Sequence, residues 1–203
     1  SDTPVSAPGP AAAPLIRAGV LCNDADITRA DGQWRADGDP MEGALVVLAR
    51  KAGIDHATLR REVPRTDEIP FDARHRFMAT LHHGHDDGSF VLVKGAPEQV
   101  LAMCATELRA AGTATLDPAP WHGAAEALAG RGQRLLALAR RPVTQGRQDL
   151  SFDDMNSGFE LLGFVGFIDP PRTEAVQAVA ECRTAVRGCG DCPNRDLSVT
   201  DGK

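Results

Sequence analysis

A lysine followed by small residues is the first feature of this sequence whose residue types suit a chemical role. The segment Lys-Gly-Ala-Pro-Glu (residues 94–98) follows the apolar run Phe-Val-Leu-Val (residues 90–93). Such a run predicts a strand that carries Lys94 to its end, where Gly95 and Ala96 let a ligand lie close to the backbone. A lysine there is a mobile point charge suited to a phosphate or to the edge of a nucleotide. Taken alone, the segment does not outweigh the plainer interpretation of a surface lysine before a tight turn.

Three further segments supply the other side chains that a nucleotide site needs. Glu42 stands in the first turn of an expected helix, Phe71 lies beside a basic cluster, and Arg134 begins an apolar run. An aromatic face suits a base, a carboxylate suits an exocyclic amine, and Lys and Arg suit phosphates. Each residue also has a plainer alternative. Phe71 would fit a core, Glu42 a helix-dipole partner, and Arg134 an ordinary surface cation.

The elements that must position these residues are predicted from the hydrophobic periodicity. Helices are expected over residues 41–52, 56–62, 121–128 and 173–183, and from Pro97 onward with Val100, Leu101 and Cys104 as apolar stripe. Strands are expected over residues 77–82, 89–93, 134–140 and 159–168. Residues 15–22 are compatible with a helix end, residues 23–32 carry turn formers, and residues 68–71 are expected to be extended. The pattern favours an α+β fold, with an antiparallel sheet and helices packed on it.

Composition excludes several classes of protein. The chain has 203 residues, enough for one domain with a core or for one domain plus a fragment of a second. Its formal net charge of -6 argues against a nucleic-acid binder, whose surface is basic. Five irregularly spaced cysteines indicate a reducing compartment rather than a disulfide framework. No apolar run approaches the roughly 20 residues of a membrane-spanning helix. The first 14 residues are rich in Ala and Pro and predict a flexible leader rather than a signal peptide.

Other groups of reactive side chains favour plain structural roles. The pair Cys189 and Cys192 has the spacing of a redox pair or of half a metal site, but incidental cysteines explain it better. His82, His83 and His85 suggest a metal cluster, but a solvated hairpin turn is the simpler interpretation. The carboxylates of residues 153–154 lack a calcium-loop pattern and are interpreted as a loop or a helix cap. No catalytic residue and no metal ligand is therefore assigned.

At their observed separations the segments resemble the nucleotide-binding domain of P-type cation-transporting ATPases, in the calcium, proton and sodium pump branch. The resemblance rests on five motifs in order: Gly-Asp-Pro-Met-Glu (38–42), Pro-Phe-Asp-Ala-Arg-His-Arg-Phe-Met (70–78), Lys-Gly-Ala-Pro-Glu (94–98), Arg before Leu-Leu-Ala-Leu-Ala (134–139) and Asp-Pro-Pro-Arg (169–172). It runs from about residue 21 to about residue 185. The sequence has no His-Pro pair, which argues against the heavy-metal branch. One motif would be weak, whereas five in order are highly specific.

The resemblance implies a role for each matching residue. It implies that Phe71 stacks on adenine, that Glu42 contacts the adenine edge, and that Lys94 and Met78 line the base pocket. The matching residues beyond the base are Gly95 and Ala96, which allow close backbone approach, and Arg76 and Arg134, which lie near the phosphates.

Two departures from the family pattern lie next to these residues. Met41 stands where the family commonly has Thr, and Ala73 stands where it often has Ser or Arg. Both changes would weaken polar contacts to a nucleotide. The segment Asp-Lys-Thr-Gly-Thr, whose Asp receives the γ-phosphate in the family, does not occur in the sequence.

The resemblance also implies a domain organisation. We expect a flexible leader over residues 1–17, a nucleotide-binding domain over 18–165, a hinge with the start of an α/β phosphorylation domain over 166–185, and an unmatched tail over 186–203. The nucleotide-binding part should be a twisted antiparallel sheet flanked by helices.

The function implied is that of a soluble, cytoplasmic domain of an integral membrane cation pump. Such a domain binds ATP with its magnesium and works with phosphorylation and actuator domains, without contacting nucleic acid or the membrane. By itself the chain is expected to be inactive. The alternative is a non-catalytic interaction module with a degenerate pocket. A free-standing kinase-like ATPase is disfavoured, because no Gly-x-x-x-x-Gly-Lys-Ser/Thr loop occurs.

Overall fold

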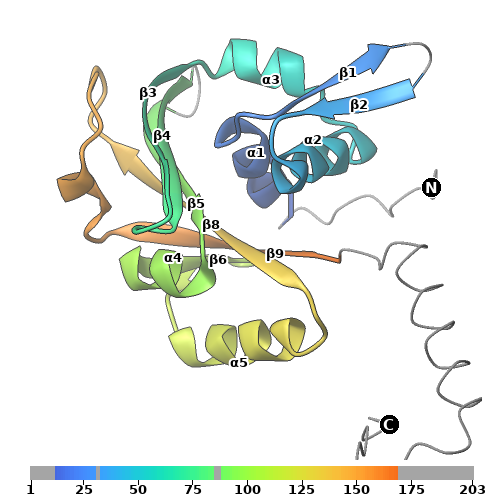
Figure 1. The fold of residues 1–203 in the computed structure, drawn as a ribbon. Coiled ribbons are helices and arrows are strands. Elements are labelled where there is room, and N and C mark those ends of the chain that lie inside the picture. Colours follow the sequence, from blue (N-terminus) through green and yellow to red (C-terminus); the bar gives the residue numbers. More distant parts are fainter. Residues whose placement is uncertain (1–11, 31–32, 85–87, 169–203) are drawn as a thin grey trace, which may run out of the picture. The chain divides into compact units, whose positions relative to one another are not determined.

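A twisted seven-stranded sheet with the strand order β3-β4-β5-β8-β9-β6-β7 forms the centre of the molecule, and β1 and β2 form a separate hairpin (Figure 1). The structure is a computed structural model that describes residues 12–30, 33–84 and 88–168. Within the large sheet β6 and β9 pair in parallel, whereas the other neighbouring strands are antiparallel. The fold class is therefore α+β, as the sequence predicted, with one parallel pair that it did not predict.

The helices and strands have the following bounds. The helices are α1 (Ala12–Leu21), α2 (Pro40–Lys51), α3 (His56–Glu62), α4 (Pro97–Met103) and α5 (Pro118–Ala129), with the 3-10 helix η1 (Phe152–Met155). The strands are β1 (Asp26–Ala30), β2 (Gln33–Asp37), β3 (Arg65–Asp72), β4 (Phe77–Gly84), β5 (Gly88–Gly95), β6 (Cys104–Arg109), β7 (Gly112–Thr115), β8 (Arg134–Val143) and β9 (Phe159–Phe167).

The two faces of the sheet carry two separate cores, because successive side chains of a strand point to opposite faces. On one face Met78, Leu92 and Leu138 pack with apolar residues of α1, α2 and α3. On the other face a second cluster joins β4, β5, β8 and β9 to α4. Helix α5 lies on that side too (Figure 1), where Trp121 packs edge-to-face on Phe164 with the ring centroids 5.0 Å apart.

Most of the expected elements are present at the expected places. The helix predicted over residues 41–52 is α2, and the helix predicted over residues 56–62 is α3. The helices expected from Pro97 and over residues 121–128 are α4 and α5. The four predicted strands are β4, β5, β8 and β9, and the extended residues 68–71 belong to β3.

Four strands near turns were not predicted: β1, β2, β6 and β7. Residues 23–32 were interpreted as carrying turn formers, but β1 lies within that range and pairs with β2 directly after it. Cys104 was placed on the apolar stripe of a helix, but α4 ends at Met103 and Cys104 begins β6. The parallel pairing of β6 with β9, which is remote in sequence, determines that change. Strand β7 was missed because its sequence, Gly-Thr-Ala-Thr, carries no apolar alternation.

The amino-terminal boundary also differs from the expected one. Residues 12–17, expected to belong to a flexible leader, form the first part of α1, and Ile16 is buried in the core. The predicted helix over residues 173–183, the hinge motif, Cys189, Cys192 and the expected tail all lie outside the described residues. In the described part of the chain, no helix combines the length and the apolar character needed to cross a membrane.

Candidate functional site

Lys94 forms a buried ion pair at the end of the central strand β5. Its ammonium group donates a hydrogen bond to Oε1 of Glu42 at 2.6 Å, and the side chains of the two residues are only 6% and 15% exposed. Neither the surface lysine nor the mobile point charge considered from the sequence agrees with this arrangement. Removing one partner of such a pair leaves an uncompensated buried charge, which costs about 3–5 kcal/mol.

Glu42 is fixed by the start of α2 and by a neighbouring loop. Asp39 caps α2 by accepting hydrogen bonds from the amides of Met41 and Glu42 at 2.9 and 3.2 Å. The second carboxylate oxygen of Glu42, Oε2, accepts from the amides of Asp24 and Ala25 at 2.9 and 3.2 Å. The carboxylate therefore has a cation on one oxygen and two backbone donors on the other.

A bulge in β3 determines the direction of Phe71. Ile69 pairs with Ala79 and Asp72 pairs with Phe77, so residues 70 and 71 together oppose the single residue Met78 of β4. Because a bulge re-aims side chains in this way, Phe71 belongs to the sheet face that carries Met78. Met78 in turn pairs with Lys94. Phe71 is 64% exposed, so the alternative that placed it in the core was wrong.

Arg134 lies on the same sheet face as Lys94. Lys94 pairs with Leu138 of β8, and the pairing of β8 with β9 is regular from Arg134 to Leu138. Side chains four residues apart on a regular strand share a face. Arg134 is exposed at the first position of β8, about 13 Å along the strand from Leu138 at the usual rise per residue.

Gly95 and Ala96 join β5 to α4 in close contact with β4. A Cβ atom on Gly95 would lie 2.5 Å from the carbonyl oxygen of Arg76 and 2.7 Å from Cβ of Phe77. The amide of Ala96 donates to that same carbonyl at 3.0 Å, and Ala96 is the N-cap residue of α4. The absence of a side chain at Gly95 is therefore required by the packing of β4 against β5.

Met78 and Arg76 occupy contrasting environments. Met78 is 1% exposed and lies in the core on the same sheet face as Phe71 and Lys94. Arg76 adopts a left-handed backbone conformation, with φ at 56°, and its guanidinium pairs with Glu98 of α4 at 2.6 Å. The fold thus brings Glu42 and Lys94 into contact, places Phe71, Met78 and Arg134 on their face, and directs Arg76 to a helix of the other layer.

The sequence reasoning missed the loop that holds Glu42, residues 22–25. Asn23 is buried, and its side-chain amide donates to the carbonyls of Gly19 at 2.9 Å and of Glu42 at 3.0 Å. Cys22 is fully buried beside it, and desolvation raises the pKa of its thiol. The only signal in the sequence was the pair Asn-Asp after a helix end, which was interpreted as a turn.

The histidines near the β4–β5 turn do not all belong to a solvated turn. His82 is 1% exposed, its ring stacks on Phe90, and Nε2 lies 2.9 Å from the hydroxyl of Thr80. Burial lowers the pKa of His82 to about 4, so its ring is neutral at pH 7. The solvated-turn interpretation was therefore wrong for His82, whereas His85 lies outside the described residues. The cap interpretation of residues 153–154 is confirmed for Asp154, which forms a capping box with Ser151.

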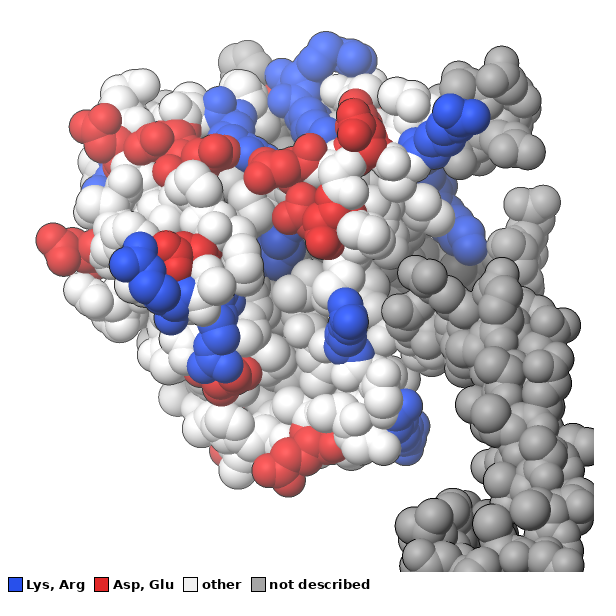
Figure 2. All heavy atoms as spheres, in the orientation of Figure 1, with Lys and Arg blue, Asp and Glu red and all other residues white. Residues whose placement is uncertain are grey.

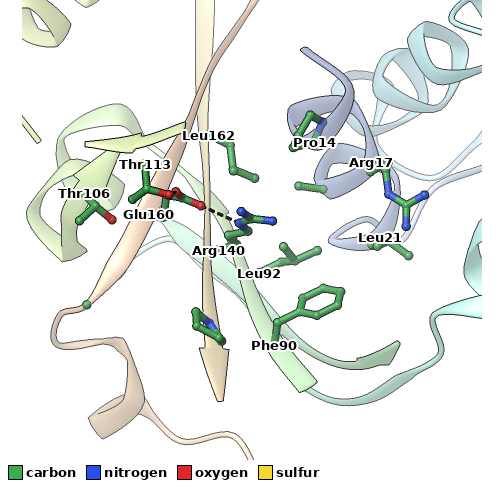
Figure 3. A pocket seen from close by; sticks show the side chains of 13 residues that line it. Pro14, Arg17, Leu21, Phe90, Leu92, Thr106, Thr113, Arg140, Glu160 and Leu162 are labelled. Atoms are coloured by element: carbon green, nitrogen blue, oxygen red, sulfur yellow. Dashed lines mark hydrogen bonds and ion pairs between the residues drawn. The ribbon is translucent and has the colours of Figure 1, made fainter. Parts of the chain in front are cut away.

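A separate hollow of about 840 Å³ opens on the same sheet face, between α1 and the strands β5, β8 and β9 (Figure 3). Arg140 and Glu160 form an ion pair within it at 2.7 Å, and Phe90 and Leu162 contribute apolar walls. None of the eight residues assigned to a nucleotide site lines this hollow. On the face shown in Figure 2, acidic and basic side chains lie interspersed.

The sequence is similar to those of known proteins over most of its length. The family described as P-type ATPase, cytoplasmic domain N, matches residues 12–174. The chain is 39% identical over 168 residues to the cation-transporting ATPase pma1 of Synechocystis sp., covering 82% of this chain and 18% of that protein. It is 38% identical over 171 residues to the probable cation-transporting ATPase F of Mycobacterium tuberculosis, covering 84% and 19%. It is 35% identical over 175 residues to the calcium-transporting ATPase of Bacillus subtilis, again covering 84% and 19%.

These matches cover most of this chain but only a small part of each relative. The chain spans about a fifth of the length of the relatives it matches. The family pattern and the relatives, however, cover most of the chain itself, and the fold agrees with the α+β architecture that the resemblance implied. This chain therefore belongs to the P-type ATPases and carries their cytoplasmic domain N.

Proposed function

We propose that this chain binds ATP as the nucleotide-binding domain of a cation-transporting P-type ATPase. In that role it presents the γ-phosphate to an acceptor aspartate of a phosphorylation domain. The observation that carries the proposal is the buried pair of Lys94 and Glu42. It lies on the sheet face that also holds an exposed aromatic ring, Phe71, and an exposed cation, Arg134.

The spacing of these residues suits an extended nucleotide. Phe71 and Lys94 are separated by two strand-to-strand steps, about 10 Å, and Arg134 lies about 13 Å further along β8. Adenine would stack on Phe71, its edge would meet Glu42 and Lys94, and the phosphates would extend toward Arg134. Met78 would form the apolar floor of the base pocket.

Arg76 has a role in this proposal that requires a change of partner. Its ion pair with Glu98 is half-exposed on both sides. Exposed pairs of this kind contribute only about 0–1 kcal/mol, so a bound phosphate can compete for the guanidinium. Gly95 and Ala96 would contribute by letting the nucleotide approach the backbone at the end of β5.

The chemistry of the intact protein would be phosphoryl transfer by positioning and charge neutralisation. Within the described residues no group of three or more His, Cys, Asp or Glu side chains is arranged to hold a metal ion. We assign the magnesium to the phosphates of the bound nucleotide, whose negative charge a divalent cation neutralises. The partners of this chain would be ATP and the phosphorylation and actuator domains of a membrane pump, on its cytoplasmic side, and the chain alone would hydrolyse no ATP.

An NMR titration of the full chain with magnesium-ATP tests the proposal. Amide signals near Phe71 and Lys94 should shift on saturation, and Phe71→Ala should weaken binding by about 1–3 kcal/mol, the usual contribution of a base stacked on an aromatic ring. The matched control is Phe152→Ala, because Phe152 is likewise exposed, at 49%, but contacts Phe77 on the other face. Equal losses from both variants would contradict the stacking assignment.

A second arm of the experiment addresses the phosphates. Arg134→Gln should weaken ATP more than AMP, because the lost cation faces the phosphates rather than the base. Arg131→Gln, at an exposed position three residues earlier, serves as the control and should leave both affinities unchanged. If the wild-type chain shows no shifts with either nucleotide, the alternative of a non-catalytic interaction module, which the departures at Met41 and Ala73 would explain, replaces the proposal.

A further inference from the structure

Glu42 has little freedom to move, because both of its carboxylate oxygens are engaged. Oε1 accepts from Lys94, and Oε2 accepts from the amides of Asp24 and Ala25. A carboxylate offers about four lone-pair positions, and three of them are occupied. The position of Lys94 on the sheet face therefore depends on Glu42, and the position of Glu42 depends on the 22–25 loop.

Two arginines from elsewhere in the chain hold that loop. Arg60 of α3 donates from Nε to the carbonyl of Val20 at 3.3 Å. One of its terminal nitrogens donates to the carbonyls of Asn23 at 3.3 Å and of Ala25 at 2.9 Å. Val20 lies in the last turn of α1, where a helix leaves its last carbonyl groups without partners inside the helix, and Asn23 and Ala25 follow that end.

Arg65, the first residue of β3, makes the stronger set of contacts. One terminal nitrogen donates to the carbonyls of Leu21 at 3.2 Å and of Asn23 at 2.7 Å. The other lies 2.6 Å from the carboxylate of Asp24 and 2.5 Å from that of Glu68. A planar guanidinium can serve four acceptors at once, which the point charge of a lysine cannot do.

We propose that Arg65 is a positioning residue for the nucleotide site. It fixes the 22–25 loop through the carbonyl of Asn23 and the carboxylate of Asp24. The amides of Asp24 and Ala25 in that loop fix Glu42, and Glu42 fixes Lys94. The proposal rests on the function proposed above. It further assigns to Glu42 the task of holding Lys94 in place in addition to any contact with the base.

The first test needs no nucleotide. In the full chain, Arg65→Lys should shift the NMR signals of the Asp24 and Ala25 amides and of the Lys94 ammonium group. The matched control is Arg147→Lys, because Arg147 also pairs with a carboxylate, Asp154, at 2.6 Å and donates to a backbone carbonyl at 2.8 Å. That control should leave all three signals at their wild-type positions. Unchanged signals in Arg65→Lys would overturn the proposal.

The second test measures ATP affinity against thermal stability. Arg65→Lys should weaken ATP binding about five- to tenfold, as expected for the loss of roughly one ordinary hydrogen bond. Arg147→Lys should lower the melting temperature to a similar degree without changing the affinity. Equal melting losses with wild-type affinity in both variants would mean that Arg65 serves stability alone, and would overturn the proposal.

A double-mutant cycle tests whether Arg65 affects ATP affinity through Glu42 or independently of it. In a Glu42→Gln background Arg65→Lys should add little to the loss of affinity, whereas fully additive losses would contradict the chain of contacts.

If Arg65→Lys fails to fold, Asp24→Asn replaces it, because this exposed carboxylate bonds Arg65 and the change keeps the backbone amide. The same signals should then shift by less, and their staying in place would refute the proposal. A wild-type chain that does not bind ATP would refute the proposed function, while the nucleotide-free signals would still decide the positioning role.

Discussion

Lys94 and Gly95 are adjacent in sequence but serve different requirements at the residue scale. The ammonium group of Lys94 is held by a carboxylate in a buried position, so its charge is fixed in direction before any ligand arrives. Gly95 has no side chain, and a Cβ atom there would collide with the backbone at the start of β4. One of the two residues is thus explained by electrostatics and the other by steric packing.

The steric requirement at Gly95 leads to a stability prediction. Gly95→Ala should destabilise the fold by about 1–3 kcal/mol, because β4 must move to relieve the contact with Arg76 and Phe77. Gly123→Ala is the matched control, since Gly123 lies within α5 and a Cβ there meets no atom within 4 Å. It should stabilise the helix by about 0.5–1 kcal/mol, the difference in helix propensity between Gly and Ala. Urea unfolding of both variants is the measurement, and a neutral Gly95→Ala would contradict the steric argument.

At the scale of elements, the start of α2 determines where Glu42 stands. Pro40 occupies the first turn, Asp39 caps the helix, and Glu42 is thereby turned toward the 22–25 loop and toward β5. The bulge in β3 has a comparable role on the other side of Lys94, since it directs Phe71 to the same sheet face. Two local irregularities, a helix start and a bulge, therefore position the residues of the candidate site on an otherwise regular sheet.

A comparison of two helix caps tests the role of α2. Asp39→Ala should cost about 0.5–2 kcal/mol of stability and should also weaken ATP binding by roughly twofold to fivefold, because the backbone before Glu42 loosens. Asp117→Ala removes the cap of α5, where Asp117 accepts from the amide of Ala119 at 3.2 Å. It should lower stability without affecting ATP affinity. An equal loss of affinity in both variants would show that general destabilisation, and not the position of Glu42, is responsible.

For the whole molecule, the neutral His82 links folding to pH. Burial is the main cause of its low pKa, and the nearby positive charge of Arg65 acts in the same direction. The folded pKa is about 4, whereas the unfolded value is near 6.5. Between these values the unfolded chain binds more protons than the folded chain, so the free energy of unfolding falls as pH falls through this window.

The expected size of this effect is on the order of 3 kcal/mol between pH 6.5 and pH 4. His82→Gln should remove most of that pH dependence, because the amide does not titrate. Thr80→Val is the control, since it removes the hydroxyl that bonds His82 and keeps the histidine. It should lower stability at every pH and retain the slope. The free energy of unfolding is measured with denaturant at intervals between pH 6.5 and pH 4. If its dependence on pH is unchanged in His82→Gln, groups other than His82 are responsible.

Much of the architecture could be predicted because it depends on local patterns. Apolar alternation located β4, β5, β8 and β9, and a proline and a capping aspartate located the start of α2. Strand β6 could not be predicted, since its pairing partner β9 lies about 50 residues away in sequence. The β1–β2 hairpin was missed because its turn-forming and polar residues outweigh its short apolar pattern.

The sequence by itself determined the family and the fold class, because short motifs in a fixed order can be recognised without knowledge of contacts. It also supplied the proposed nucleotide-site residues Glu42, Phe71, Lys94 and Arg134, which remain a prediction. Only the tertiary structure decided that Lys94 is buried and paired and that Arg76 is directed to α4. It also decided that Arg60 and Arg65 hold the loop behind Glu42. The physical reason is that burial and partner choice arise between segments distant in sequence, and the sequence order of such segments does not specify their distances in space.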